Sequence, residues 1–147
     1  MSYNIWLLRF DHGNPTPMDH AAFQRLTDPY VVKREPEHDF LELLMPDGGG
    51  ADVHAVVEPD GTLASVMLTH FSPGAVLDLV AKPAKALRAA VILQDGVAIV
   101  ADVEQRDSLV LDLRQDAVIV ELDGLAIQGV VDPERSGPRA STTKSET

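Results

Sequence analysis

The chain has 147 residues, and its 23 acidic against 12 basic side chains give it a formal net charge of −11. An acidic surface repels phosphate backbones and anionic lipid, so we expect neither nucleic acid nor a membrane as a direct partner, whereas a basic protein stays compatible. The absence of cysteine excludes a disulfide framework, a thiol nucleophile and a thiolate metal site.

The length suits one domain, because a chain of this size buries roughly 70% of the surface that its unfolded form exposes. The excess negative charge is confined to one part of the chain. Residues 1–131 hold nine basic against twenty acidic side chains, whereas residues 132–147 hold three of each. The acidic surface therefore belongs to the part that is expected to fold.

The first predicted element is a strand over residues 4–10. Its apolar side chains fall on both faces, at Ile5 and Leu7 on one and at Trp6, Leu8 and Phe10 on the other. This pattern is typical of a central strand that is covered on both sides. The apolar run is interrupted at Arg9, so it predicts neither a signal peptide nor a membrane span, and we expect a cytoplasmic location.

A first helix is predicted to begin at Pro17, with Thr16 as its N-cap and Asp19 as the acid of a capping box. It must end before Pro29, because the residue ahead of a proline disfavours the helical conformation. Helical spacing gives it a buried stripe that consists of Met18, Ala22, Phe23 and Leu26.

Four Asp-Gly pairs punctuate the chain, at 47–48, 60–61, 95–96 and 123–124. Asp-Gly tolerates the positive φ angles that tight hairpins need, so the pairs flanked by apolar runs predict hairpins. We expect a short extended piece at 30–32, a strand at 40–45 and a hairpin over 52–71 that turns at 59–61. The pair at 47–48 opens a glycine triplet and is interpreted as a flexible connection.

A second helix is predicted after Ser72, its N-cap, with Pro73 in the first turn. Pro83 interrupts the helix and predicts a kink or two short helices. The apolar stripe of this helix consists of Val76, Leu77, Val80, Ala84 and Leu87.

The last third of the chain is predicted to be almost entirely strand. Turns at Asp95-Gly96, Gln115-Asp116 and Asp123-Gly124 would fold it into an antiparallel meander. The first turn would pair Ile92 with Ile99, and the last would pair Leu122 with Leu125. One register would then collect eight apolar side chains on one face, which is why this interpretation is favoured.

Residues 132–147 contain no apolar side chain larger than Pro or Ala, which is typical of a disordered tail. The predicted fold is α+β: a single domain over residues 1–131, with a mainly antiparallel sheet of hairpins and meander, two helices packed on it, and a disordered C-terminal tail.

Two pairs of histidines are candidates for chemistry. His12 and His20 each follow an aspartate, and imidazoles with nearby carboxylates can bind Zn or Fe. Their spacing matches no compact ligand motif, so we interpret them as solvated residues and expect no metal and no cofactor. His54 and His70 lie on the two strands of the central hairpin and are interaction candidates rather than catalytic residues.

A regular hairpin that turns at 59–61 would place His54 and His70 on the same face of the sheet. Val56, Val66 and Leu68 would then lie between them, too far along the hairpin for the two imidazoles to share a ligand.

Two further segments contain residues of the kind that bind ligands. The glycine-rich stretch 47–52 is followed by a predicted strand, has no lysine and has two aspartates that repel phosphate, so a flexible connection is favoured over a nucleotide site. Asp102, Glu104 and Asp107 form an acidic cluster around a predicted loop between strands. The cluster lacks the residue order of an EF-hand, and we interpret it as a solvated rim that can meet a basic partner.

The sequence contains no Gly-x-Ser-x-Gly elbow, no His-Glu-x-x-His pair and no Cys/His dyad, so we expect no enzyme activity. The favoured hypothesis is a non-catalytic, acidic protein-interaction module that binds a partner protein through its acidic surface or a sheet edge, in an immunity-like, antitoxin-like or adaptor role. Two alternatives stay open: a small-molecule-binding or enzymatic domain with a His-containing pocket, and a structural subunit of a β-rich oligomer, which includes a homodimer.

Overall fold

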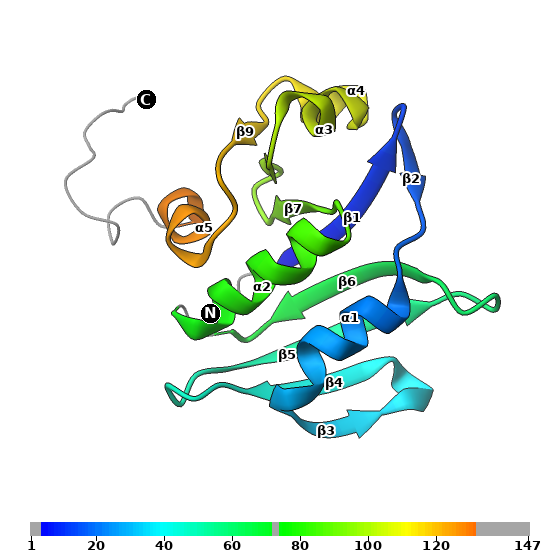
Figure 1. Cartoon of the computed structure of the whole chain (residues 1–147), viewed down its shortest axis with the longest axis vertical. Coiled ribbons are helices and arrows are strands. Elements are labelled where there is room, and N and C mark those ends of the chain that lie inside the picture. Colours follow the sequence, from blue (N-terminus) through cyan, green and yellow to red (C-terminus); the bar gives the residue numbers. More distant parts are fainter. Residues whose placement is uncertain (1–3, 72–73, 132–147) are drawn as a thin grey trace.

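The computed structural model describes residues 4–71 and 74–131 and shows helices packed on one large sheet (Figure 1). The described residues form nine strands and five α-helices, so the predicted α+β class is confirmed. The predicted tail at 132–147 and the predicted cap at Ser72 and Pro73 lie outside the described residues.

In chain order the elements are β1 (Ile5–Asp11), β2 (Asn14–Thr16), α1 (His20–Thr27), β3 (Val31–Glu35), β4 (Phe40–Leu44), β5 (Gly50–Val57), β6 (Leu63–Thr69), α2 (Ala75–Ala86), β7 (Ala90–Leu93), β8 (Ala98–Val100), α3 (Val103–Ser108), α4 (Leu111–Arg114), β9 (Val118–Ile119) and α5 (Gly124–Val131). Single turns of 3₁₀ helix, Asp28–Tyr30 and Pro36–His38, flank β3. Most strand residues therefore lie in the first half of the chain and most helical residues in the second.

The strand β1 lies in the interior of the sheet, between β6 and β7, as predicted. The strand order is β3-β4-β5-β6-β1-β7-β8-β9, and β2 pairs with the end of β1. Neighbouring strands are antiparallel except β8 and β9, which are parallel. The sheet is therefore mixed rather than purely antiparallel. Alternate side chains of β1 enter two different cores, with Ile5 and Leu7 in the first and Trp6 and Leu8 in the second.

The central hairpin forms where it was predicted, but its register differs by one residue. A bulge near the turn sets His54 opposite Met67, whereas regular pairing from the turn at 59–61 would set it opposite Val66. Because side chains alternate along a strand, a slip of one residue exchanges the two faces. Val66 and Leu68 consequently lie in the main core, and the prediction that they separate His54 from His70 on one face is wrong.

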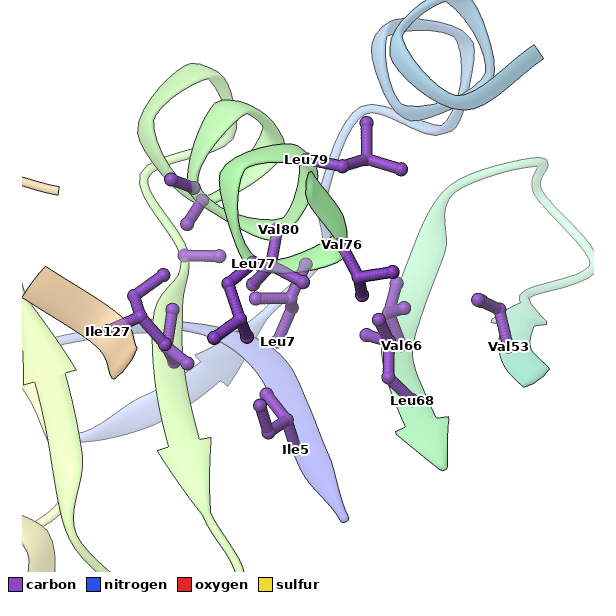
Figure 2. Close-up of a cluster of buried hydrophobic side chains, with 14 of the residues drawn as sticks. Ile5, Leu7, Val53, Val66, Leu68, Val76, Leu77, Leu79, Val80 and Ile127 are labelled. Carbon is purple, nitrogen blue, oxygen red and sulfur yellow. The ribbon is translucent and has the colours of Figure 1, made fainter. Parts of the chain in front are cut away.

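The main core lies between one face of the sheet and the helices α1, α2 and α5. Figure 2 shows Leu7 and Val66 of the sheet with Val76 and Leu77 of α2 and Ile127 of α5 in one cluster. Each of these five side chains is at most 1% exposed. Because full burial of an aliphatic side chain contributes roughly 1.5–3 kcal/mol, this helix-covered face supplies much of the stability of the fold.

Both predicted helices form, and α1 begins with a cap other than the predicted Thr16. α1 starts three residues later than expected, with Asp19 as N-cap, and the Asp19 carboxylate accepts a hydrogen bond from the Ala22 N–H at 3.1 Å. The first amide of α2, that of Ala75, donates instead to a distant side chain, the carboxylate of Asp47, at 3.0 Å. The glycine-rich connection thus docks on the N-terminus of α2.

α2 runs as one helix of 12 residues through Pro83, so the alternative of two short helices is wrong. Pro83 stands in the last turn and cannot donate to the carbonyl of Leu79, so the helix loses one hydrogen bond there and still continues to Ala86. The helix ends in a Schellman motif: the Arg88 N–H donates to the Lys85 carbonyl, the Ala89 N–H donates to the Ala84 carbonyl, and Arg88 has a φ of 56°.

The predicted meander of the last third is wrong. Only β7, β8 and the two-residue β9 form, and the remaining segments are the helices α3, α4 and α5. The pair Asp123-Gly124 begins α5 rather than a turn, because the Asp123 carboxylate accepts the Ala126 N–H at 2.7 Å. An aspartate side chain accepts hydrogen bonds from the free amides at a helix N-terminus as readily as from the amides of a turn. Leu125, which was expected to pair with Leu122, is 83% exposed on α5.

The turn between β7 and β8 is one residue longer than predicted. Ile92 pairs with Ala98, whereas a two-residue turn would have paired it with Ile99. The Leu93 N–H donates to the carbonyl of Val97, and Gly96 within the turn has a φ of 93°. The Asp-Gly pair therefore does mark a hairpin, in its three-residue form with glycine at the left-handed position.

A smaller second core lies on the other face of the sheet. There Leu109 and Leu113, from the segment that carries α3 and α4, pack with Ile92, Val100 and Trp6. This segment covers β1, β7 and β8 only. Within residues 4–71 and 74–131, no helix packs on the same face of β4, β5 and β6.

Candidate functional site

The uncovered face of β4, β5 and β6 carries a continuous row of side chains. The register sets Phe40 opposite His54, His54 opposite Met67, and Met67 opposite Trp6, which continues into the second core. We call this surface the open face. It consists of Phe40, Glu42 and Leu44 of β4, Asp52, His54 and Val56 of β5, and Ser65, Met67 and Thr69 of β6.

The open face is acidic beside the edge strand β3. Glu42 stands directly opposite Asp52, so two carboxylates share a cross-strand position. The ammonium of Lys33, on β3, lies 3.1 Å from the carboxylate of Glu35. The pKa of Lys33 is raised, first by this hydrogen bond and also by attraction to Glu42 and Asp52. The local field is thus negative even where a lysine is present.

The structure brings both predicted hairpin histidines to this surface, at different places. The rings of His54 and Phe40 have centroids 5.4 Å apart and planes tilted by 58°. The Nδ1 atom of His54 is buried and has no hydrogen-bond partner among the described residues. His70 follows β6 with a φ of 52°, and its Nδ1 lies 3.1 Å from Oδ2 of Asp52. His54 therefore belongs to the row, and His70 borders it.

Asp102, Glu104 and Asp107 lie at the start of α3 and along it, not in a loop between strands as predicted. Asp102 is the N-cap, and its Oδ1 accepts a hydrogen bond from the Gln105 N–H at 2.8 Å. The spacing from Asp102 to Gln105 is that of a capping box, a signal in the sequence that the meander interpretation overlooked.

Basic side chains neutralise part of this acidic cluster. The two terminal nitrogens of Arg88 lie 3.0 and 3.3 Å from the carboxylate oxygens of Asp102, and one of them is 3.7 Å from Glu104. The hydrogen bond from Arg88 is the main reason that the pKa of Asp102 lies below its ordinary value. Asp107 pairs with Arg106 at 3.3 Å. The cluster is therefore less negative than the sequence indicated.

A cleft of about 640 Å³ opens where β1 leaves β7. The last residues to pair are Leu8 and Ala90, beyond which β1 pairs with β2 and projects beside α3 (Figure 1). The tip of this projection is tied to α3, because the Gly13 N–H donates to the Ser108 carbonyl at 2.8 Å. We call this site the hairpin cleft. Residues 9–12, Arg88 and the α3 residues Val103, Glu104, Gln105, Asp107 and Ser108 line it.

Sequence reasoning missed Arg9 and Arg88 as candidate site residues. The side chain of Arg9 has no ion pair or hydrogen bond to another residue in the described part of the chain, and Arg9 lines the hairpin cleft. Its only signal in the sequence is that it interrupts an apolar run. Arg88 gives no local signal at all, because its position depends on how α2 ends and on where α3 packs.

The other predicted ligand candidates do not come together. His12 lines the hairpin cleft, with its Nδ1 2.8 Å from Oδ1 of Asp11, while His20 begins α1 and lines a separate hollow. In the described ranges, no group of three or more His, Asp or Glu residues is placed to hold a metal ion. The carboxylate of Asp47 accepts a hydrogen bond from the first amide of α2. It therefore lies where a phosphate would bind to the N-terminus of this helix.

Comparison with known proteins gives no family for the chain: no family model, no curated protein and no solved structure matches it. None of the described helices is both long and apolar enough to cross a membrane. The candidate functional sites are therefore the open face and the hairpin cleft, and the case for each rests on its geometry alone.

Proposed function

We propose that the protein is a non-catalytic protein-binding module that docks a basic partner protein on its open face. The observation that carries this proposal is the row from Phe40 through His54 to Met67, over which no described helix lies. Val56, 40% exposed, extends the row beside His54, and Leu44, 53% exposed, lies on the same face beyond Glu42 and Asp52. Contiguous apolar surface rimmed by polar residues is characteristic of protein-binding sites.

The negative charge around the row determines which charge on a partner is complementary. Glu42 and Asp52 stand side by side on the open face, and the whole chain carries a net charge of −11. A partner with basic residues around an apolar centre complements this pattern, whereas a second copy of the chain would set like charges against one another. An immunity-like or antitoxin-like role, in which the module covers a functional surface of a basic protein, fits this chemistry, and so does an adaptor role.

His54 supplies a polar anchor within the row. A buried polar atom without a partner costs free energy relative to one that forms a hydrogen bond. The Nδ1 atom of His54 is such an atom among the described residues. Because Nδ1 is buried, a group of the partner can bond to it only when the His54 side chain turns outward, and that bond would then remove the cost and fix the register of the complex.

The open face is a better docking surface than a sheet edge or the acidic cluster on α3. The edge strand β3 contains a bulge and the charged run Lys33, Arg34 and Glu35, features that discourage strand addition. The edge strand β9 has only two residues. The cluster on α3 is partly neutralised by Arg88 and Arg106.

Two double variants that introduce positive charge test the proposal. The double variant Leu44→Arg and Val56→Arg places cations within the open face at exposed positions, so the fold should persist. The control, Leu111→Arg with Leu125→Arg, makes the same change at side chains that are 73% and 83% exposed on α4 and α5. Wild type and both variants serve as baits for proteins of the native host, and a recovered partner is then purified and titrated.

We expect one stoichiometric basic protein that binds wild type and control equally and binds the open-face variant at least about tenfold more weakly, because buried like charges cost several kcal/mol. Its association rate should fall as ionic strength rises. The proposal would be refuted if the open-face variant bound the partner as tightly as wild type does, or if the partner were an acidic protein. A homodimer in light scattering that the open-face variant disrupts would refute it in favour of self-association.

A further inference from the structure

Both positive and negative side chains line the hairpin cleft. On the β1 side stand Arg9, which has no carboxylate partner in the described part of the chain, and His12, whose Nδ1 lies 2.8 Å from the carboxylate of Asp11. On the α3 side stand the carboxylates of Glu104 and Asp107. A cleft of this kind attracts neither a simple anion nor a simple cation across its whole width, but it complements a small molecule that carries both charges.

Hydrogen bonds of Arg88 and Gln105, which both line the cleft, connect α3 to the end of α2. The side chain of Arg88 is fixed by its two hydrogen bonds to Asp102. Its carbonyl accepts a hydrogen bond from Nε2 of Gln105 at 3.2 Å, and Oε1 of Gln105 accepts the Ala101 N–H at 2.8 Å. Gln105 is only 7% exposed. These contacts come from three segments, so the wall formed by α3 is preorganised relative to α2.

Two residues that line the cleft have strained backbones. His12 has a φ of 52° and Arg88 a φ of 56°, in the left-handed region where glycine or asparagine would be less strained. Each occupies a place where glycine is common, His12 in a tight hairpin turn and Arg88 at the end of a helix. Two of the four described non-glycine residues with positive φ therefore line this one cleft.

We propose that the hairpin cleft binds a small zwitterion, an α-amino acid with an apolar side chain. Its carboxylate would pair with the Arg9 guanidinium, and its ammonium would lie against Glu104 and Asp107. The apolar side chain would contact Phe10 and Val103, which also line the cleft. A volume of about 640 Å³ accommodates a ligand of this size. No residue of the cleft belongs to the open face, so the site is independent of the proposed protein partner.

Calorimetric titration of the full chain with L-leucine tests the site. Leucine is expected to bind with a Kd on the order of 1 mM or tighter. N-acetyl-leucine lacks the ammonium and leucine amide lacks the carboxylate, so each should bind at least about fivefold more weakly. Absence of leucine binding at about 20 mM, or equal binding of either analogue, would overturn the proposal.

Substitutions on each wall test which residue binds the carboxylate of leucine and which binds its ammonium. Arg9→Gln should weaken leucine binding about tenfold, whereas Arg25→Gln, at an exposed position on α1, should leave it unchanged. Glu104→Gln should weaken the binding of leucine and leave that of N-acetyl-leucine unaffected, because only leucine presents an ammonium. Leucine should shift the backbone amide resonances of residues 9–13 and 103–108. Wild-type affinity in Arg9→Gln, or shifts confined to other residues, would overturn the assignment.

Discussion

Arg88 is predicted to be more strained than a glycine would be at its position. It follows α2 as the left-handed residue of a Schellman motif, with a φ of 56°. We expect Arg88→Gly to be more stable than Arg88→Ala. Both substitutions remove the ion pair with Asp102, so its contribution cancels in the comparison and only the backbone term differs.

The magnitude follows from the backbone. A side chain in the left-handed region costs about 1–2 kcal/mol, which glycine avoids. The greater conformational entropy of glycine in the unfolded chain reduces this advantage by about 0.4–1 kcal/mol. The difference between the two variants should therefore be about 1 kcal/mol in favour of glycine, which corresponds to about 4 °C in Tm for a domain of this size.

Urea unfolding followed by the fluorescence of Trp6 measures this difference. Trp6 is the only tryptophan and packs in the second core, so its emission reports on the tertiary structure. Lys85→Gly and Lys85→Ala form a matched control inside α2, where alanine should be more stable by about 1 kcal/mol. If Arg88→Gly is no more stable than Arg88→Ala while the control behaves as expected, the assignment of backbone strain at Arg88 is refuted.

Two further predictions concern α2 and α5. The pKa of Asp47 is lowered, first by the hydrogen bond from the Ala75 N–H and then by that from Gly49. The stability that Asp47 contributes is therefore present above the unfolded pKa, near 3.8, and is lost as pH falls through the folded pKa. Thermal midpoints should consequently depend less on pH below that value in Asp47→Asn than in wild type, and equal slopes would contradict the cap. In α5, Ile127→Ala should destabilise the protein by about 2–5 kcal/mol because Ile127 is fully buried. Leu125→Ala should change stability by less than about 0.5 kcal/mol, and similar losses in chemical denaturation would favour a strand in which both face the core.

The Asp-Gly pairs illustrate how far local patterns reach. At 60–61 and 95–96 each lies in the turn of an antiparallel hairpin, as predicted. At 123–124 the same dipeptide begins α5, with Asp123 bonded to the Ala126 amide. Asp-Gly relieves strain at positive φ and supplies a carboxylate, so it serves a turn or a helix start equally well. Which of the two forms depends on the long-range partner, here Asp78, whose carboxylate accepts the Gly124 N–H.

The candidate sites were predicted only in part. His54 was a candidate from its place on a hairpin strand, but its neighbours depend on a bulge that shifts the register by one residue. Asp102, Glu104 and Asp107 were recognised as a cluster, and their pairing with Arg88 and Arg106 was not. Arg9 and Arg88 line one cleft, which opens where β1 exchanges β7 for β2 as its partner, a choice that no local pattern encodes.

The sequence by itself determined the α+β class, the central β1 strand, both early helices and the central hairpin, because each depends on periodicity, caps and turn residues that act over a few positions. The tertiary structure alone decided which sheet face stays uncovered, which arginine meets which carboxylate, and whether the last third forms strands or helices. The predicted meander would place Leu122 and Ile127 on its apolar face, and the observed structure also buries both, at 2% and 0% exposed. Only packing against α2 and the rest of the sheet, through contacts between residues far apart in the chain, separates the two in free energy.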